Sequence, residues 1–541
     1  MRRLLLISVL LMLLSSCQQE PLHVGGKPGR EEELQQRKVE LAFRLNAGTT
    51  KASIDNSDPE TKVTNLLVIA RPVDAVDSWS KSVVTTFVNP SITAGQFRGD
   101  VNACIGNNVF YVLVNYTKEM LDFIGSGKGL RESRESAFCP DLSSESTFGG
   151  KQQKLLSQFM NPSRGYTMMA KCTHAGDTLV NVAPDATALA LDGDLHRMLA
   201  KVHMEFDVYE QATDQVVVLG YLDNHASEIP NDIRVHGLES GKKGSQSGWV
   251  PLSSIRYCLN AVNAKVFLQA DDDCTEPTVF PLDPNYHLDD TIEASGADWK
   301  YKDGYGDDFV FCDPNGASEL FDAYPSAPYP AWMATASSGS SLYCLENTVS
   351  SRHFLDGFDE NTSYRRFAPR RATTHLLVEA RFIPRYIIVG RNGDSYDYHV
   401  GFERMEDAIT FLGGDGTFWT HDLKHFFNES GKNAEIAYTT AKHAVDPKIA
   451  ALTESDFVKY KEGKCYYTAY ISGGQGTDPD SGRSFLTFKE GDSSIRRDAS
   501  YTLKAKVLHV PSINMSMMEI NTTGSLEWND FDKNGVVNIK P

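Results

Sequence analysis

The stretch Val39-Glu40-Leu41-Ala42-Phe43-Arg44-Leu45-Asn46-Ala47 decides the fold class that this sequence predicts. Apolar residues stand at every second position, and Glu40, Arg44 and Asn46 stand between them, a period that is typical of a strand with one buried face. Short runs of similar composition, separated by Gly, Asp, Asn, Pro and Ser, predict further strands. They cover residues 62–70, 109–116, 199–209, 215–221, 375–383, 385–389, 465–471 and 501–510.

Helical periodicity is sparse, and Lys118–Ile124 and Ser455–Lys461 are the two best short candidates. The pattern therefore predicts an all-β chain of β-sandwich architecture, with long loops and few short helices. We place a domain change near residue 195, after a predicted loop at Asn181–Gly193. The stretch Gly237–Pro369 is unusually long for the loops of one sandwich, and we interpret it as surface decoration.

Composition limits the classes of function. The chain has 541 residues, and its 53 Lys and Arg against 71 Asp and Glu give a formal net charge of −18. This acidic balance argues against nucleic-acid binding, which requires a basic face for the phosphates. After residue 16 no stretch approaches the roughly 20 apolar residues of a membrane span.

The N-terminus predicts export. Arg2 and Arg3 precede an 11-residue apolar run, Leu4–Leu14, and Leu14-Ser15-Ser16-Cys17 follows at once. This is the pattern of a lipoprotein signal peptide at residues 1–16, with Cys17 as the lipidated residue. Lipidation would anchor the precursor in the outer membrane; an ordinary signal peptide with an incidental cysteine is the alternative interpretation.

Eight further cysteines permit disulfides or buried thiols, and the sequence does not choose between them. The Cys172-Thr173-His174 group, and Cys274 beside Asp271-Asp272-Asp273, could suggest a metal ion. Neither has the paired ligand spacing of a metal site, so we predict no metal and no cofactor. The eight are Cys104, Cys139, Cys172, Cys258, Cys274, Cys312, Cys344 and Cys465.

The C-terminal region repeats the alternating design of residues 39–47. In MEINTTGSLEW, residues 518–528, the even-numbered residues are mainly apolar and the odd-numbered residues are polar. The chain therefore carries two strands of matched pattern, one near each end. Either both pack within their own chain, or the second fills, in a neighbouring copy, the place that the first vacates. The predicted donor face is Met518, Ile520, Thr522, Leu526 and Trp528, and the predicted displaced face is Val39, Leu41, Phe43 and Leu45.

The segment Gly48–Glu60 favours the second alternative. It is polar, and it holds Lys51-Ala52 directly after the first strand, where a trypsin-like protease would cut. A cut after Lys51 would release residues 17–51, and with them both the lipid and the strand.

The chain resembles the fimbrillin family of Bacteroidales, and most of all the shaft subunits of the short, Mfa-type fimbriae. No single motif carries the resemblance; the order of several motifs along most of the chain does. They are Leu14–Cys17, VELAFRL with Lys51-Ala52 behind it, KVTNLLVIA, Tyr166–Cys172, Arg197–Val202, His375–Arg385, Phe411–Trp419, Lys459–Ile471 and Arg496–Val507.

The resemblance implies two transthyretin-like β-sandwich domains, at 52–195 and 196–511, behind a propeptide at 17–51 and ahead of a donor segment at 512–541. It implies cleavage at Lys51–Ala52 by a gingipain-type surface protease, although the family's usual residue there is Arg. It further implies a head-to-tail polymer of the chain with itself, accessory tip and anchor subunits as partners, and adhesion to host or bacterial surface ligands.

No enzymatic site emerges from the motifs. Gly125-Ser126-Gly127-Lys128-Gly129 lacks the first Gly and the Ser or Thr of a phosphate loop. Asp530–Gly535 copies half of a calcium loop, but Pro541 stands where the bidentate Glu is needed. We predict a structural fimbrial subunit and no enzyme; the alternative is a surface lipoprotein that binds glycan or host protein without polymerising.

Overall fold

The computed structural model describes most of the chain, and all structural statements below concern these ranges. They are 34–46, 61–93, 96–131, 136–210, 212–216, 218–219, 248–269, 284, 292–295, 298–301, 309–310, 334–335, 341–347, 374–392, 395–421, 424–426, 458–471, 474–477, 484–487, 495–509, 517–519, 521–528 and 536–538. Strands dominate them, so the chain is all-β, and the described ranges contain three α-helices, α2 (Lys118–Gly125), α3 (Phe148–Phe159) and α5 (Met405–Phe411).

Two sheets built from residues 36–197 form the first part of the molecule. Their strands are β1 (Gln36–Asn46), β2 (Asn65–Pro72), β3 (Val83–Val88), β4 (Ile92–Thr93), β5 (Gln96–Cys104), β6 (Gly106–Val114), β9 (Met168–Lys171), β10 (Val180–Val182), β11 (Ala188–Asp194) and β12 (His196–Arg197). One sheet has the order β11-β1-β5-β4, and the other has the order β12-β9-β6-β2-β3, with β10 beside β6. A short hairpin, β7 (Met160–Asn161) with β8 (Gly165–Tyr166), lies apart from them.

Burial explains why these two sheets have different sequence patterns. In β2, Leu66 and Val68 belong to the core between the two sheets, whereas Leu67 and Ile69 belong to a second core on the opposite face. The α2 residues Met120 and Ile124 lie in that second core, as do α3 residues. A strand buried on both faces has a continuous apolar run, as β2 has. β1 alternates because its outer face is exposed.

The remaining strands build the second part of the molecule. They are β13 (Leu199–Phe206), β14 (Val208–Tyr209), β15 (Ala212–Val216), β16 (Val218–Leu219), β17 (Gly248–Trp249), β18 (Arg256–Asn260), β19 (Val262–Asn263), β20 (Ile292–Ser295), β21 (Asp298–Tyr301), β22 (Phe309–Val310), β23 (Ala334–Thr335), β24 (Leu342–Leu345), β25 (His375–Arg381), β26 (Ile383–Pro384), β27 (Tyr386–Asn392), β28 (Ser395–Gly401), β29 (Phe418–His421), β30 (Lys424–Phe426), β31 (Val458–Tyr460), β32 (Lys464–Tyr470), β33 (Gly474–Thr477), β34 (Ser484–Thr487), β35 (Ala499–His509), β36 (Met517–Glu519), β37 (Asn521–Trp528) and β38 (Val536–Asn538).

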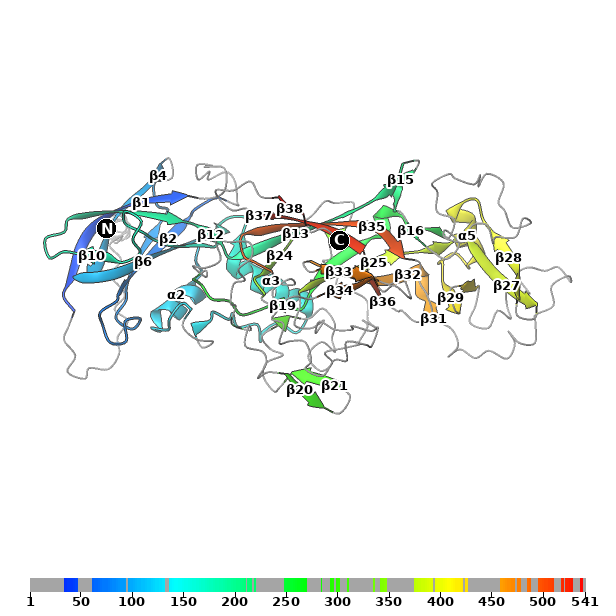
Figure 1. Cartoon of the computed structure of the whole chain (residues 1–541), viewed down its shortest axis with the longest axis horizontal. Helices are drawn as coiled ribbons and strands as arrows, with labels where there is room; N and C mark the ends of the chain where they lie inside the picture. Colours follow the sequence, from blue (N-terminus) through cyan, green and yellow to red (C-terminus); the bar gives the residue numbers. More distant parts are fainter. Residues whose placement is uncertain are drawn as a thin grey trace, which may run out of the picture.

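Three larger sheets organise these strands. Their orders are β24-β13-β35-β37-β38 with β16 beside β35, β23-β18-β25-β32-β36, and β28-β27-β30-β29-β31. Figure 1 shows the molecule extended along one axis, with β1, β4 and β10 at one end and β27, β28 and α5 at the other.

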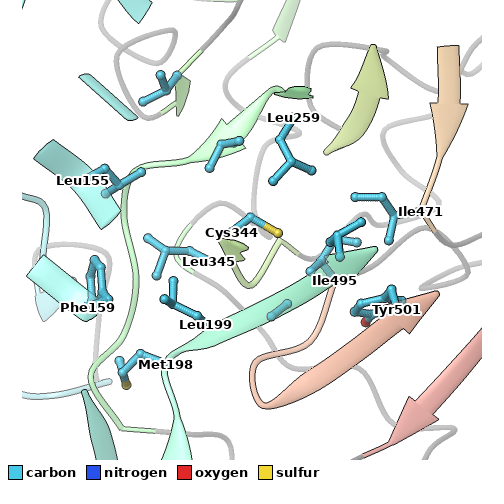
Figure 2. Close-up of a cluster of buried hydrophobic side chains, with 14 of the residues drawn as sticks. Leu155, Phe159, Met198, Leu199, Leu259, Cys344, Leu345, Ile471, Ile495 and Tyr501 are labelled. Carbon is cyan, nitrogen blue, oxygen red and sulfur yellow. The ribbon is translucent and has the colours of Figure 1, made fainter. Parts of the chain in front are cut away.

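One apolar core joins the two parts. In Figure 2, Leu155 and Phe159 of α3 belong to the same cluster as Leu199 of β13 and Leu345 of β24, and Tyr501 of β35 lies in it as well. The predicted domain change near residue 195 falls between β11 and β13, next to this cluster. This domain boundary stays a prediction, because residues before and after it belong to the same apolar core.

Most sequence-predicted elements are present, and two predictions are wrong. The helix Lys118–Ile124 is confirmed as α2, whose N-cap Thr117 accepts a hydrogen bond from the Met120 N–H. The helix predicted at Ser455–Lys461 is wrong, because β31 and a 3-10 turn (Lys461–Gly463) occupy its described part. There Tyr460 is buried and stacks on Phe418 at 5.0 Å, so pairing with β29 overrides the local helical pattern.

The second wrong prediction is the loop at Asn181–Gly193, which contains the end of β10 and most of β11. Its run Ala188-Leu189-Ala190-Leu191 is apolar at every position, so the stretch lacks an alternation of apolar and polar residues in the sequence. The ordering of β11 comes from its neighbours in the sheet, which are far away in the chain.

All six described cysteines are in the thiol form. Five are buried, at positions 104, 172, 258, 344 and 465, and Cys139 is exposed. Burial raises the pKa of Cys344 to about 12 and also raises the pKa of Cys172. Within the described ranges, no group of acidic, His and Cys side chains is arranged to hold a metal ion, and no helix has the length and apolar character of a membrane span.

We expect thiol reactivity to follow this burial. At pH 8 iodoacetamide should modify Cys139 in the native chain and leave Cys344 and Cys172 unmodified until urea is added, because the thiolate is the reactive form. Peptide mass spectrometry reads each site separately. Modification of Cys344 before unfolding would contradict the buried placement.

A buried ion pair connects the start of β35 to the end of β24. The Arg497 guanidinium donates to the Glu346 carboxylate and to the carbonyl oxygens of Phe267 and Leu268. The two charged side chains are 7% and 1% exposed, so each is a desolvated charge with a single strong counter-charge.

Replacing Arg497 with Met should therefore destabilise the chain strongly. The Glu346 carboxylate would stay buried without its cation, and we expect a loss of about 3–5 kcal/mol in the free energy of unfolding by urea. Arg404→Met is the matched control, because Arg404 pairs with Glu406 and Asp407 on the surface, where ion pairs contribute about 0–1 kcal/mol. Equal losses in the two variants would contradict this account.

Candidate functional site: the groove that holds the first strand

β1 lies inside a sheet, although it is the first described strand of the chain. It pairs antiparallel with β5 on one side and parallel with β11 on the other. Leu41 faces Gly99 in β5 and Leu189 in β11, and Phe43 faces Phe97 and Leu191 in the same way. We call the space between β5 and β11, which β1 occupies, the β1 groove.

The inner face of β1 is part of the core of the first sandwich. Val39 and Leu41 are fully buried, and Phe43 is 1% exposed. The Phe43 and Phe97 rings are stacked, with their centroids 6.2 Å apart. The Phe97 and Phe87 rings pack edge to face, with their centroids 4.8 Å apart. At ~1.5–3 kcal/mol for each fully buried side chain, this face is a large share of the stability of the sandwich.

The outer face of β1 is charged and exposed. Lys38 pairs with Asp100 at 2.7 Å, and Glu40 approaches Arg98 at 3.9 Å. Arg44 lies 3.9 Å from Asp192 of β11. These pairs are screened by water and add little stability, but they give each wall of the groove a fixed pattern of charge.

The β11 wall has a second attachment that does not involve β1. The Thr173 N–H donates to the Asp192 carbonyl at 2.8 Å, and the Asp192 N–H donates back to Thr173 at 2.9 Å. A ring nitrogen of His174, Nδ1, lies 2.7 Å from the Ala190 carbonyl oxygen. We call residues 172–177, which make these contacts and end in a tight turn, the clasp.

The clasp gives the Cys172-Thr173-His174 motif a structural role. Gly193 of β11 passes so close to this segment that an added Cβ would lie 3.2 Å from the Cys172 sulfur. The clasp turn closes through paired backbone hydrogen bonds between His174 and Asp177, with Gly176 at φ +92°. β11 is thus tied to the opposite sheet, while β5 is tied to β4 by a ladder and to β6 by the single residue Ile105.

The predicted inward-facing residues of the first strand lie on one face of β1, as the alternating pattern predicted, where their burial is described. Val39, Leu41 and Phe43 point into one core, and Leu45 has Gly193 as its register partner. Cys17 and the Lys51–Ala52 bond lie outside the described residues.

The predicted C-terminal strand differs from its expected form. It is divided into β36, which contains Met518, and β37, which contains Thr522, Leu526 and Trp528; Ile520 lies outside the described residues. β36 pairs parallel with β32, whereas β37 pairs antiparallel with β35. Its other neighbour is the three-residue β38, close to the end of the sheet.

Sequence reasoning did not find the two walls or the clasp. β5 carries a signal that could have been used, because Phe97, Val101 and Ala103 are buried at alternate positions around Gly99. The clasp has no local signal, since its hydrogen bonds join Thr173 and His174 to residues 16 to 19 positions away.

Comparison with solved structures gives remote likenesses. One is a protein of Parabacteroides distasonis described as a cell adhesion protein, with a TM-score of 0.39 and 12% identity over 91% of this chain and 98% of that chain. A fimbrilin from Porphyromonas gingivalis has a TM-score of 0.35 and 11% identity over 90% and 96%. The tip fimbrial protein Mfa3 of the same species has a TM-score of 0.31 and 10% identity over 91% and 99%.

No family model matches the chain, and no curated protein matches it. The solved structures named above are fimbrial and cell adhesion proteins, which is the class that the sequence resembles. At identities of 10–12% they are remote neighbours of this chain.

The buried inner face of β1 predicts a specific stability effect. Phe43→Ala should cost about 3–5 kcal/mol, because it removes a fully buried aromatic ring from a packed core. Arg44→Ala, on the exposed face of the same strand, should cost less than ~1 kcal/mol. Urea unfolding measures the cost, and hydrogen exchange of β5 and β11 localises it; a similar cost for both variants would contradict the assignment of faces.

Proposed function

We propose that this chain is the structural subunit of a fimbria, polymerised by donor-strand exchange and supporting adhesion and biofilm formation. In this proposal the chain is exported as a lipoprotein through Cys17 and is held in the outer membrane as a precursor. A trypsin-like surface protease cuts after Lys51, and the cleaved subunits join head to tail into a fimbrium on the cell surface, with accessory tip and anchor subunits at its ends.

The position of β1 is the observation that carries this proposal. β1 is an interior strand with a buried inner face, yet it precedes every other described strand of the chain. A single cut behind it would therefore separate it from the rest of the fold. Arg37, Lys38 and Arg44 also lie in this region, but within β1. Arg44 is paired on both sides, and Arg37 and Lys38 are paired with β5, so strand pairing protects the backbone there from a protease.

Loss of β1 would create a strong demand for a replacement strand. The cores around Leu41 and Phe43 would open to water, and β5 and β11 would each present an unpaired edge. Such edges pair readily with an extended segment from another chain. The clasp and the β4–β5 ladder would keep both walls in place while the β1 groove is empty.

The alternating C-terminal segment is the proposed replacement. Among the described strands of its own chain, β37 has one long partner, β35, and the three-residue β38 on its other side. In the β1 groove of another copy it would have a long partner on each side, so backbone pairing favours exchange.

The cleavage step is testable with two variants of one residue. Trypsin-like treatment of the chain should give a product beginning at Ala52, and this product should form ladders that resist SDS. Lys51→Ala should abolish both the product and the ladders, whereas Lys51→Arg should preserve them. Ladders formed by Lys51→Ala with residues 17–51 still attached would contradict the proposal.

Removal of residues 512–541 tests the donor assignment separately. This truncated chain should still be cut after Lys51 but should remain monomeric on SDS gels without heating. Ladders from the truncated chain would show that another segment fills the β1 groove. Recovery of surface protein only with a lipidated Cys17 would instead favour a non-polymerising lipoprotein that binds glycan or host protein.

A further inference from the structure

We propose a register for the incoming strand: residues 524–528 of a second copy fill the β1 groove in the direction of β1, with Trp528 in the place of Phe43. Leu526 then takes the place of Leu41, and Glu527 faces Arg98. This inference rests on the proposed function, and it names the residues that decide which segment fits the β1 groove.

The position that Phe43 occupies in the β1 groove favours Trp528 over the other residues of the C-terminal segment. Phe43 packs against the Phe97 ring and faces Leu191 across the opposite ladder, so a small side chain there would leave a cavity in the core. Trp528 and Phe531 are the aromatic residues of the segment 512–541. Phe531 at this position would place Asn529 at the fully buried position of Leu41, which leaves Trp528.

The same register returns a leucine to the position of Leu41. Strands place alternate residues on one face, so Trp528 at position 43 puts Leu526 at position 41. Leu41 faces Gly99, where an added Cβ would lie only 2.6 Å from the Phe97 ring and 2.8 Å from the Phe87 ring. These rings fill the space beside the glycine, and Leu526 would meet the same surface that Leu41 meets now.

Charge excludes the two neighbouring registers. With Trp528 at position 43, Glu527 stands at position 42, directly across from Arg98 of β5. A shift of two residues in one direction would place Glu527 at position 44, across from Asp192 of β11. A shift in the other direction would bury the Asp530 carboxylate at the position of Phe43, inside the apolar core.

The backbone fixes the direction. β1 runs parallel to β11 and antiparallel to β5, and these two ladders space their hydrogen-bonding groups differently. The clasp and the β4–β5 ladder hold the walls at these spacings. A strand running the same way as β1 meets both sets of groups without movement of either wall.

A cysteine scan tests the register directly. Arg98→Cys is combined in turn with Asn521→Cys, Thr523→Cys, Ser525→Cys or Glu527→Cys, and each chain is cleaved, polymerised and oxidised. Directly facing strand residues have the Cα separation that a disulfide needs. We expect reducible cross-links between subunits for the pair at 98 and 527. We expect none for the other three pairs, or for variants that carry only one of the two introduced cysteines.

The outcomes separate the register from the function on which it rests. Polymer that cross-links through 521, 523 or 525, or through none of the four, overturns the register and leaves donor-strand exchange standing. Cleaved chain without SDS-resistant polymer, in the unmodified protein as well, means that the proposed function has failed.

A charge swap at the exposed side chain of Arg98 provides a second test of the register. Arg98→Glu should slow polymerisation by about two- to fivefold, the range for one facing pair on an exposed sheet. Arg98→Glu with Glu527→Arg should recover the rate, whereas Arg98→Glu with Glu519→Arg should not. Recovery by the Glu519 variant would place that residue opposite Arg98 and overturn the register.

Discussion

The first sandwich depends on one contact, the burial of the inner face of β1 between β5 and β11. The Phe43 and Phe97 rings stack in this core. Leu41 faces Gly99 of β5, and the Phe97 ring lies beside that glycine. Most domains complete such a core with a strand that chain connections hold on both sides. Here it is the first described strand, so the completeness of the core depends on a segment that a single cut can separate from the strands that follow.

Each wall of the β1 groove has attachments that do not involve β1. β11 is bonded through Thr173 and His174 to the opposite sheet, and β5 is held by β4 and by its short link to β6. With β1 in place, the space between these walls has a defined width, direction and charge pattern. Those three properties are what an incoming strand would have to match.

The two ends of the chain are placed differently. β1 has two long partners and a buried face, whereas β37 has one long partner and a short neighbour at the end of a sheet. In the exchange proposed above, the C-terminal strand would therefore gain backbone pairing on entering a β1 groove. The shared core around Leu199 and Leu345 joins the two parts of the molecule.

Three features follow from local sequence pattern, because side-chain period and capping are local properties. They are the all-β class, the alternation of β1 with Val39, Leu41 and Phe43 inward, and the short helix α2. Three others follow from long-range contacts: residues 188–194 form a wall of the groove, residues 458–460 are a strand and not a helix, and Thr173 and His174 form part of the clasp. Those outcomes depend on ladders and ring contacts between residues far apart in the chain, as with Tyr460 on Phe418, and no local pattern records such a partner.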